Sequence, residues 1–384
     1  MSKSVYNYKK LLIISDTSMK IDDTGKIKIL EPVAREIQHV EKLFDEITWI
    51  GYDYSDDKTI NFKGIKSQKI NYVVLERTGG KYFMDKINII KNIIPYTALL
   101  LRHIHKHNII HTRCPSLPGF ITIIISRFFT KKVFWHKYAG DWSSRNIPPF
   151  YRLQRLLLNI SIPSPSFVGI NGNWPIQKRH LINIENPCLT KGELDSGYEV
   201  TEKKDYYGNI KICFVGRLDK KKGVDRIIEA IKILDNKKWI DNVYFIGDGP
   251  DRNEFELNAE NIKNIKINFT GAIFRQELNE YYKKCHIIIL PSLSEGFPKV
   301  ITEAIAYGCV PISSNSGSVG QYLTRDFGII LNNISPKTIS TTLIKIEKNR
   351  NILKNKAAKG YQLASFFLYE KYNEKIKGLL TKYA

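Results

Sequence analysis

The chain has 384 residues, of which 43% are hydrophobic and 25% are charged. These values exclude a largely disordered chain, and the length suits two domains that each bury a core. The formal net charge of +21 would suit an anionic partner, but lysine abounds together with isoleucine and asparagine, as a general compositional bias would also produce.

The cysteines and the apolar runs indicate the cellular compartment in which the protein works. The five cysteines, which form no CxxC pair, are Cys114, Cys188, Cys213, Cys285 and Cys309. They predict reduced thiols and no metal site. The apolar run at 11–14 is shorter than a signal-peptide core, and the run at 119–126 falls short of the ~20 residues that span a bilayer. We therefore expect a cytoplasmic chain without a spanning segment.

In the first half, short β-branched runs alternate with longer amphipathic stretches, which is typical of βα units and a parallel sheet. Strands are predicted at 11–15, 47–51, 109–111, 133–138 and 167–170, and helices at 31–44 and 85–106.

A polar, lysine-rich connection at 190–209 precedes a second series of the same kind. Strands are predicted at 210–215, 242–246, 265–270, 287–291, 310–313 and 328–331. Residues 339–384 have a helical period, and their aromatic part at 366–372 needs a surface to bury against. The expected domains are 1–188 and 189–365, with 366–384 as a helix that packs back on the first domain.

The stretch PSLSEGFPKVITEAIAYG, residues 291–308, follows a buried strand. Pro298 suits the first position of a helix and Gly308 suits the position after its end, so a helix is predicted at 298–307. Ligands of open α/β sheets bind beyond the carboxyl ends of strands, and a helix N-terminus offers free amides to phosphate. A phosphate is therefore expected near the amides of 297–300.

Two carboxylates flank this phosphate position. Glu295 precedes the helix, and Glu303 lies about 7 to 8 Å along it at 1.5 Å per residue. A carboxylate accepts hydroxyl hydrogen bonds well and repels phosphate, so the pair predicts hydroxylated rings on both sides, as in a nucleoside diphosphate sugar. Taken singly, either acid could be an ordinary solvated residue.

The segment FVGRLDKKKGVD, residues 214–225, also begins at the carboxyl end of a predicted strand. Arg217 could bind phosphate oxygens in bidentate fashion, and Lys222 could stabilise a departing diphosphate. Lys220 and Lys221 fit a solvated loop.

Two further turns end strands of the same sheet. IGDGP, residues 246–250, lacks the sequence of a P-loop or of GxGxxG, and a tight strand-to-helix connection explains it better than a binding site does. The turn TGAI, residues 270–273, could offer backbone groups to a base.

In this order and spacing, FVGRLDKKKGVDRIIEA, IGDGP, FTGAI and PSLSEGFPKVITEAIAYGCVPISS resemble the C-terminal domain of retaining GT-B glycosyltransferases of group 1, or family 4. The resemblance covers about 210–331, whereas the first half matches in layout alone. It implies an α/β fold of GT-B architecture, with two Rossmann-like αβα domains facing across a cleft. The first would be the acceptor side and the second would bind the donor.

The resemblance also implies roles for individual residues. Glu295 would contact the donor sugar and position it for retention of configuration, while Arg217 and Lys222 would stabilise the leaving diphosphate. The residues that it implies against the donor are Gly216, Asp248, Gly249, Ile273, Gly296, Phe297, Pro298, Lys299, Val300 and Glu303, with Glu303 on the ribose and Ile273 beside the base. The donor would be of the UDP or GDP type, with no metal or other cofactor.

The first half departs from the family pattern. Its first loop, SDTSMKIDDTG, has Gly25 in place of a Gly-Gly pair. His136, in VFWHKYAGDW, is a candidate catalytic residue, although a histidine beside Trp135 is more often packed in a core.

The acceptor is less defined than the donor. Cations lie beside apolar residues at 102–107 and 127–132, where they could rest on an anionic membrane, but two ordinary helix ends explain them slightly better. The resemblance implies a glycan or lipid-linked acceptor in cell-surface polysaccharide or lipopolysaccharide synthesis, at the inner face of the membrane. The alternatives are a sugar-nucleotide epimerase of similar architecture and a non-enzymatic basic nucleic-acid-binding protein. No nucleic-acid partner is expected, because the basic residues show no clustering with aromatics.

Overall fold

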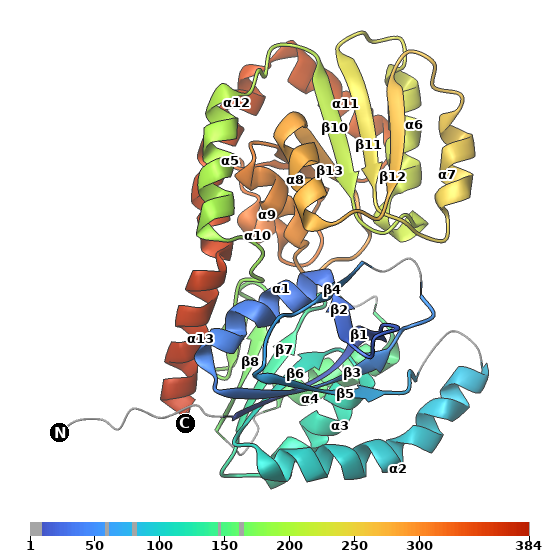
Figure 1. The fold of residues 1–384 in the computed structure, drawn as a ribbon. Helices are drawn as coiled ribbons and strands as arrows, with labels where there is room; N and C mark the ends of the chain where they lie inside the picture. Colours follow the sequence, from blue (N-terminus) through green and yellow to red (C-terminus); the bar gives the residue numbers. More distant parts are fainter. Residues whose placement is uncertain (1–9, 58–60, 79–82, 145–146, 161–164, 384) are drawn as a thin grey trace, which may run out of the picture. The chain divides into compact units, whose positions relative to one another are not determined.

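The structure is a computed structural model that describes residues 10–57, 61–78, 83–144, 147–160 and 165–383 (Figure 1). The chain forms two compact units. Unit 1 is Met1–Ile184 together with Tyr372–Ala384, and unit 2 is Glu185–Lys371. These boundaries lie a few residues from the domain boundaries predicted at 188 and 366.

Unit 1 is built on a mostly parallel sheet. Its parallel strands, in the order in which they pair, are β5 (Ile70–Leu75), β3 (Glu46–Asp53), β1 (Lys10–Ile21), β6 (Ile109–Cys114), β7 (Val133–Tyr138), β8 (Ser166–Ile170) and β9 (Leu181–Asn183). Two antiparallel strands, β2 (Ile27–Leu30) and β4 (Phe62–Gly64), extend from the end of β1. The helices are α1 (Glu31–Val40), α2 (Phe83–Lys106), α3 (Leu117–Ile125) and α4 (Pro149–Asn159), with short 3-10 turns at Glu41–Leu43 and Ser126–Phe128.

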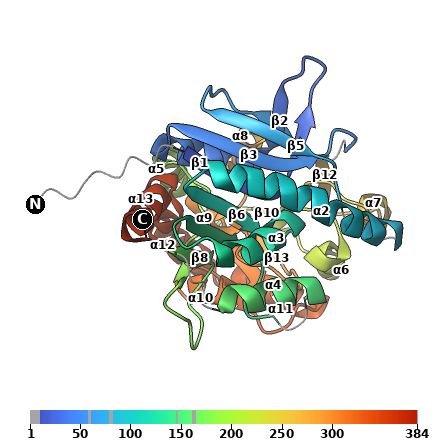
Figure 2. The same ribbon diagram turned by 90° about the horizontal axis from the view of Figure 1, so that it is seen from below.

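Both faces of this sheet are buried at β1, which explains why residues 11–14 of this strand are a continuous apolar run. Leu11 and Ile13 belong to the core on one face, and Leu12 and Ile14 belong to the core on the other, under α2 and α3 (Figure 2). All five strands predicted for this half lie in the sheet, whereas β2, β4, β5 and β9 were not predicted.

The C-terminal helix α13 (Tyr369–Tyr383) is part of unit 1 from Tyr372 onward. Tyr372, Ile376 and Leu380, each four residues apart, belong to the same core cluster as Leu11 and Ile13. At this spacing the three side chains share one face of the helix.

Unit 2 has an entirely parallel sheet. The strands pair in the order β12 (Lys266–Gly271), β11 (Ile240–Ile246), β10 (Ile210–Val215), β13 (Ile287–Leu290), β14 (Val310–Ser314) and β15 (Ile329–Leu331). The helices are α5 (Lys191–Lys203), α6 (Val224–Leu234), α7 (Arg252–Ala259), α8 (Arg275–Lys284), α9 (Lys299–Ala306), α10 (Val319–Tyr322), α11 (Pro336–Lys348) and α12 (Asn351–Ala364), and Ser365–Phe367 is a 3-10 turn. All six predicted strands are present. Because the strand order reverses between β10 and β13, their carboxyl ends form a switch point where ligands bind in such sheets.

The connection predicted at 190–209 is wrong, because most of it is helix α5. The Thr190 side chain accepts from the Glu193 amide, and the Glu193 side chain accepts from the Thr190 amide, which is a capping box. This reciprocal cap starts a helix in a stretch whose polar composition had suggested a loop.

No helix within the described residues has the length and apolar character that crossing a bilayer requires.

Candidate functional site

Three glycines bring together the loops that follow β10, β11 and β12. The Gly216 amide donates to the Ile246 carbonyl at 3.0 Å, and the Gly247 amide donates to the Gly271 carbonyl at 2.9 Å. A Cβ atom on Gly247 would lie 2.0 Å from the Gly216 carbonyl oxygen, and the φ of Gly247 is +134°. The loops therefore pack backbone against backbone at this edge of the sheet, where no side chain would fit.

The loop after β10 carries Lys222 to Glu295. Lys220–Lys222 forms a 3-10 turn that Asp219 caps by accepting from the Lys222 amide. Lys222 Nζ lies 2.5 Å from Glu295 Oε1, and the two side chains are 30% and 15% exposed. The Leu293 amide donates to the Lys221 carbonyl at 2.9 Å, which joins the two loops through their backbones as well.

The loop that carries Glu295 is held from behind. A Cβ atom on Gly317 would lie 2.1 Å from the Glu295 carbonyl oxygen, and the Ser318 amide donates to the Gly296 carbonyl at 3.0 Å. Phe297 is buried and stacks on Phe367 with ring centroids 4.8 Å apart. The Phe297 side chain thus anchors the loop in the core, and its own contact with a ligand would have to come through the backbone.

Helix α9 begins at Lys299, one residue later than predicted, because Pro298 has extended ψ and serves as its N-cap. Pro298, Lys299 and Val300 are partly exposed at this N-terminus, where free amides favour an anion. Gly308 follows the helix with a φ of +74°, as its place after the last turn predicted.

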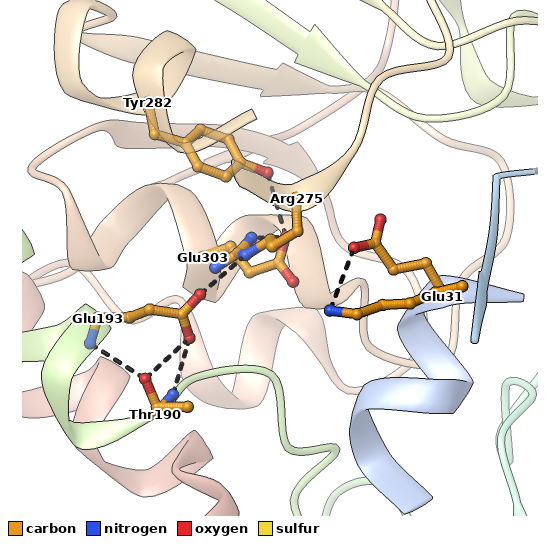
Figure 3. Close-up of polar contacts among 7 residues, drawn as sticks. Glu31, Thr190, Glu193, Arg275, Tyr282 and Glu303 are labelled. Atoms are coloured by element: carbon orange, nitrogen blue, oxygen red, sulfur yellow. Dashed lines mark hydrogen bonds and ion pairs between the residues drawn. The ribbon is translucent and has the colours of Figure 1, made fainter. Parts of the chain in front are cut away.

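Glu303 lies in a buried ionic chain with α8 and α5. Its Oε2 is 2.6 Å from Arg275 Nη1 and accepts from the Tyr282 hydroxyl at 3.3 Å, and Arg275 Nε is 3.2 Å from Glu193 Oε1. Figure 3 shows Arg275 between the two carboxylates. Burial lowers the pKa of Arg275, but Glu303 and Glu193 outweigh this and raise it above its ordinary value. Burial also raises the pKa of Tyr282 well above its usual range.

The other predicted residues of unit 2 are less closely engaged. Arg217 is 63% exposed, and its Nε lies 3.3 Å from Asp219 Oδ2. Asp248 accepts from the Gly249 amide at 2.8 Å, and a Cβ on Gly249 would lie 2.3 Å from the Leu218 carbonyl oxygen, so this pair forms a tightly packed turn. Ile273 is half-buried against the core of unit 2.

His136 lies in the middle of β7 in unit 1 and is fully buried. Its Nδ1 is 2.6 Å from Thr112 Oγ1, and burial lowers the pKa of His136 to about 3. A neutral ring enclosed in the sheet has a packing role, and this geometry does not present it to a ligand.

Among the residues that the structure places, no three His, Cys, Asp or Glu side chains gather as a metal site would require, and all five cysteines are buried and unbridged. A cavity of about 780 Å³ lies beside β15, between α11 and α12, and none of the predicted site residues lines it.

Comparison with known families identifies the second half of the chain. Residues 201–363 match the family model described as glycosyl transferases group 1. Residues 201–363 thus form a domain of the group 1 glycosyltransferase family. Protein CapJ of Staphylococcus aureus is 25% identical to this chain over 319 residues, which cover 77% of each chain.

The name of a second relative states its activity. It is the GalNAc-α-(1→4)-GalNAc-α-(1→3)-diNAcBac-PP-undecaprenol α-1,4-N-acetyl-D-galactosaminyltransferase of Campylobacter jejuni, 31% identical over 145 residues, or 37% of each chain. Among solved structures, Anabaena Alr3699/HepE in complex with UDP is similar with a TM-score of 0.69 at 15% identity, covering 97% of this chain and all of that one. The predicted GT-B fold is thereby confirmed.

Sequence reasoning missed the partners of Glu303, which are Arg275, Tyr282 and Glu193. One signal was available, because Thr190 and Glu193 form the S/T-x-x-E pattern of a capping box. Arg275 and Tyr282 gave none, since one arginine and one tyrosine in a polar helix resemble solvent-facing residues.

Proposed function

We propose that this glycosyltransferase moves a hexose-type sugar from a nucleoside diphosphate sugar, of the UDP or GDP type, to a glycan or lipid-linked acceptor with retention of configuration. The observation that carries the donor assignment is the Lys222–Glu295 ion pair beside the start of α9. The second carboxylate, Glu303, lies about one turn further along the same helix. A cation, free amides and two hydroxyl acceptors at one sheet edge suit a diphosphate between a sugar and a ribose.

In the proposed reaction, the bond between the anomeric carbon and the diphosphate oxygen breaks, and the acceptor oxygen bonds to the same face of that carbon. The acceptor proton passes to the departing diphosphate. Lys222, the amides at the start of α9 and Arg217, once it turns from Asp219, would stabilise the developing negative charge. We propose that these groups act without a metal ion, and that Glu295 positions the sugar through its hydroxyls.

We further propose that the setting is cell-surface polysaccharide or lipopolysaccharide synthesis. The undecaprenol-linked substrate in the name of the Campylobacter relative supports a lipid-linked acceptor.

Unit 1 offers a surface for peripheral membrane contact. The 3-10 turn after α3 exposes 80% of Phe128, and the neighbouring α4 exposes 43% of Leu153 and 58% of Leu156. Arg127 donates to the Leu157 carbonyl and so joins the two elements. Apolar side chains beside cations suit the surface of an anionic bilayer at the cytoplasmic face.

The test of the donor assignment is thermal unfolding with UDP, GDP, ADP or single-stranded DNA, followed by hydrolysis assays on a panel of nucleotide sugars. We expect one nucleoside diphosphate to raise the melting temperature and the corresponding sugar to be hydrolysed slowly. Stabilisation by DNA alone would contradict the proposal. The anomeric configuration of the product, read by NMR, tests retention separately.

A further inference from the structure

We propose that Arg275 is a positioning residue that fixes the Glu303 carboxylate to receive the ribose hydroxyls of the donor. This inference rests on the proposed function. It assigns a role in donor selection to a side chain that would not itself touch the nucleotide.

The two carboxylate oxygens of Glu303 differ in their contacts. Oε2 takes both the Arg275 ion pair at 2.6 Å and the Tyr282 hydroxyl at 3.3 Å. Within the described residues Oε1 has no such contact, so it is the oxygen left to accept from a ligand. Two contacts from α8 hold Oε2 and so restrict where Oε1 can lie, and a restrained acceptor binds a hydroxyl with less loss of side-chain freedom.

Arg275 is fixed in turn from α5. Its Nε pairs with Glu193 Oε1, and Glu193 Oε2 accepts from the Thr190 amide at 2.9 Å. The Glu193 amide donates back to Thr190 Oγ1 at 3.1 Å. The helix cap thus holds Glu193, and Glu193 restrains the guanidinium whose Nη1 forms the ion pair with Glu303.

Charge supports the same assignment. Glu303 is only 8% exposed, and burial disfavours an ionised carboxylate that has no cation beside it. Without Arg275, the buried Glu303 would face Tyr282 on α8 and the Glu193 carboxylate on α5. Arg275 therefore supplies the cation that a buried carboxylate needs, and its loss would leave Glu303 near a second carboxylate.

The experiment compares ribonucleotides with deoxyribonucleotides. Isothermal titration would measure the Kd of UDP and GDP and of their 2′-deoxy forms for the whole protein and for the Arg275→Met variant. We expect the wild type to prefer the ribose form by on the order of tenfold, the value of one charge-assisted hydrogen bond. Arg275→Met should reduce this preference to roughly twofold or less and leave the Kd of the 2′-deoxy form within about twofold of wild type, because the diphosphate contacts stay intact.

Arg350→Met is the matched control. The Arg350 side chain is 10% exposed, pairs with Glu347 and lies over the Trp239 ring, so its loss also removes a buried guanidinium from unit 2. It should lower thermal stability and leave the ribose preference as in wild type.

The outcomes separate the inference from the function on which it rests. Wild-type protein that binds neither nucleotide contradicts the proposed function itself. Wild-type binding without a ribose preference, or a full preference in Arg275→Met, overturns the positioning role. Equal weakening of both forms in Arg275→Met also overturns it, because that pattern reports general damage to the site. If Arg275→Met does not fold, Glu193→Gln is tested in its place. We expect its ribose preference to lie between that of wild type and twofold. A ribose preference equal to that of wild type would overturn the inference.

Discussion

Replacing Glu295 by glutamine should strengthen the binding of a nucleoside diphosphate while it weakens catalysis. In the structure Lys222 Nζ is 2.5 Å from Glu295 Oε1, so a diphosphate must compete with Glu295 for this cation. Because the two side chains are 30% and 15% exposed, solvent screens the pair, and we assign it about 1 kcal/mol. Glutamine keeps the volume and removes the charge, so the Kd of the diphosphate should fall by about fivefold.

Turnover should move in the opposite direction. If Glu295 positions the donor sugar, its loss misplaces the anomeric carbon, which costs roughly a hundredfold in rate. Lys222→Met should weaken diphosphate binding and also lower the rate. Lys221→Met removes an equal charge from the adjacent, exposed position and should do neither.

The assay is isothermal titration with UDP and GDP at two salt concentrations, together with initial rates of nucleotide-sugar hydrolysis. If Glu295→Gln weakens diphosphate binding as much as Lys222→Met does, the two side chains do not compete in the way proposed. A loss of affinity in Lys221→Met equal to that in Lys222→Met would show that net charge, and not the position of Lys222, governs binding.

Three further predictions concern stability and binding. Gly317→Ala should lower the free energy of unfolding in urea by about 3 kcal/mol, because a strained φ costs about 1 kcal/mol and its Cβ would lie 2.1 Å from the Glu295 carbonyl oxygen. Acid should reduce the contribution of His136: its pKa is lowered to about 3, so the unfolded chain gains the proton first, and the stability gap between wild type and His136→Gln should shrink as pH falls from about 6.5 to 4. Glu303→Ala should weaken nucleotide-sugar binding in titrations more than Glu295→Ala, whereas Glu295→Ala should chiefly lower the rate of transfer.

The first two of these predictions have their own controls. Gly25 also has a positive φ, of +75°, but nothing lies within 4 Å of an added Cβ, so Gly25→Ala should cost the backbone term alone. Equal losses at Gly25 and Gly317 would show that the loop yields to the new methyl group. Parallel pH profiles for wild type and His136→Gln would contradict the buried neutral state. A large loss of activity in folded His136→Gln would restore His136 as a catalytic candidate.

The fold was predictable where the sequence pattern was strong. Strands β10, β13 and β14 of unit 2 are buried almost throughout and stand out as short β-branched runs between turns. Of the strands missed in unit 1, β2 and β4 lack this signal, because they are short antiparallel additions whose residues are mostly partly or fully exposed. Helix α5 was missed for another reason, because its polar composition suggested a connection between domains. The Thr190–Glu193 capping box was the local sign of a helix that the sequence analysis did not use.

The sequence predicted which loops form the candidate site, but it did not predict how their side chains pair. Position after a strand placed Lys222, Glu295 and the start of α9 at one edge of the sheet. The pairing of Lys222 with Glu295 depends on the path of two loops, and that path depends on contacts such as Gly317 against the Glu295 carbonyl, which are distant in sequence. The Arg275–Glu303 pair was equally hidden, because 28 residues separate the two side chains and no local pattern joins them.

Helix α13 determines how the protein can be divided. A fragment that stops at Ile184 would lack Tyr372, Ile376 and Leu380, and their sites in the core of unit 1 would be left open to water. Unit 1 expressed in isolation would therefore need residues 372–384 supplied as a separate peptide or fused by a linker. Unit 2 is one unbroken segment, so Glu185–Lys371 is the natural piece for nucleotide titrations.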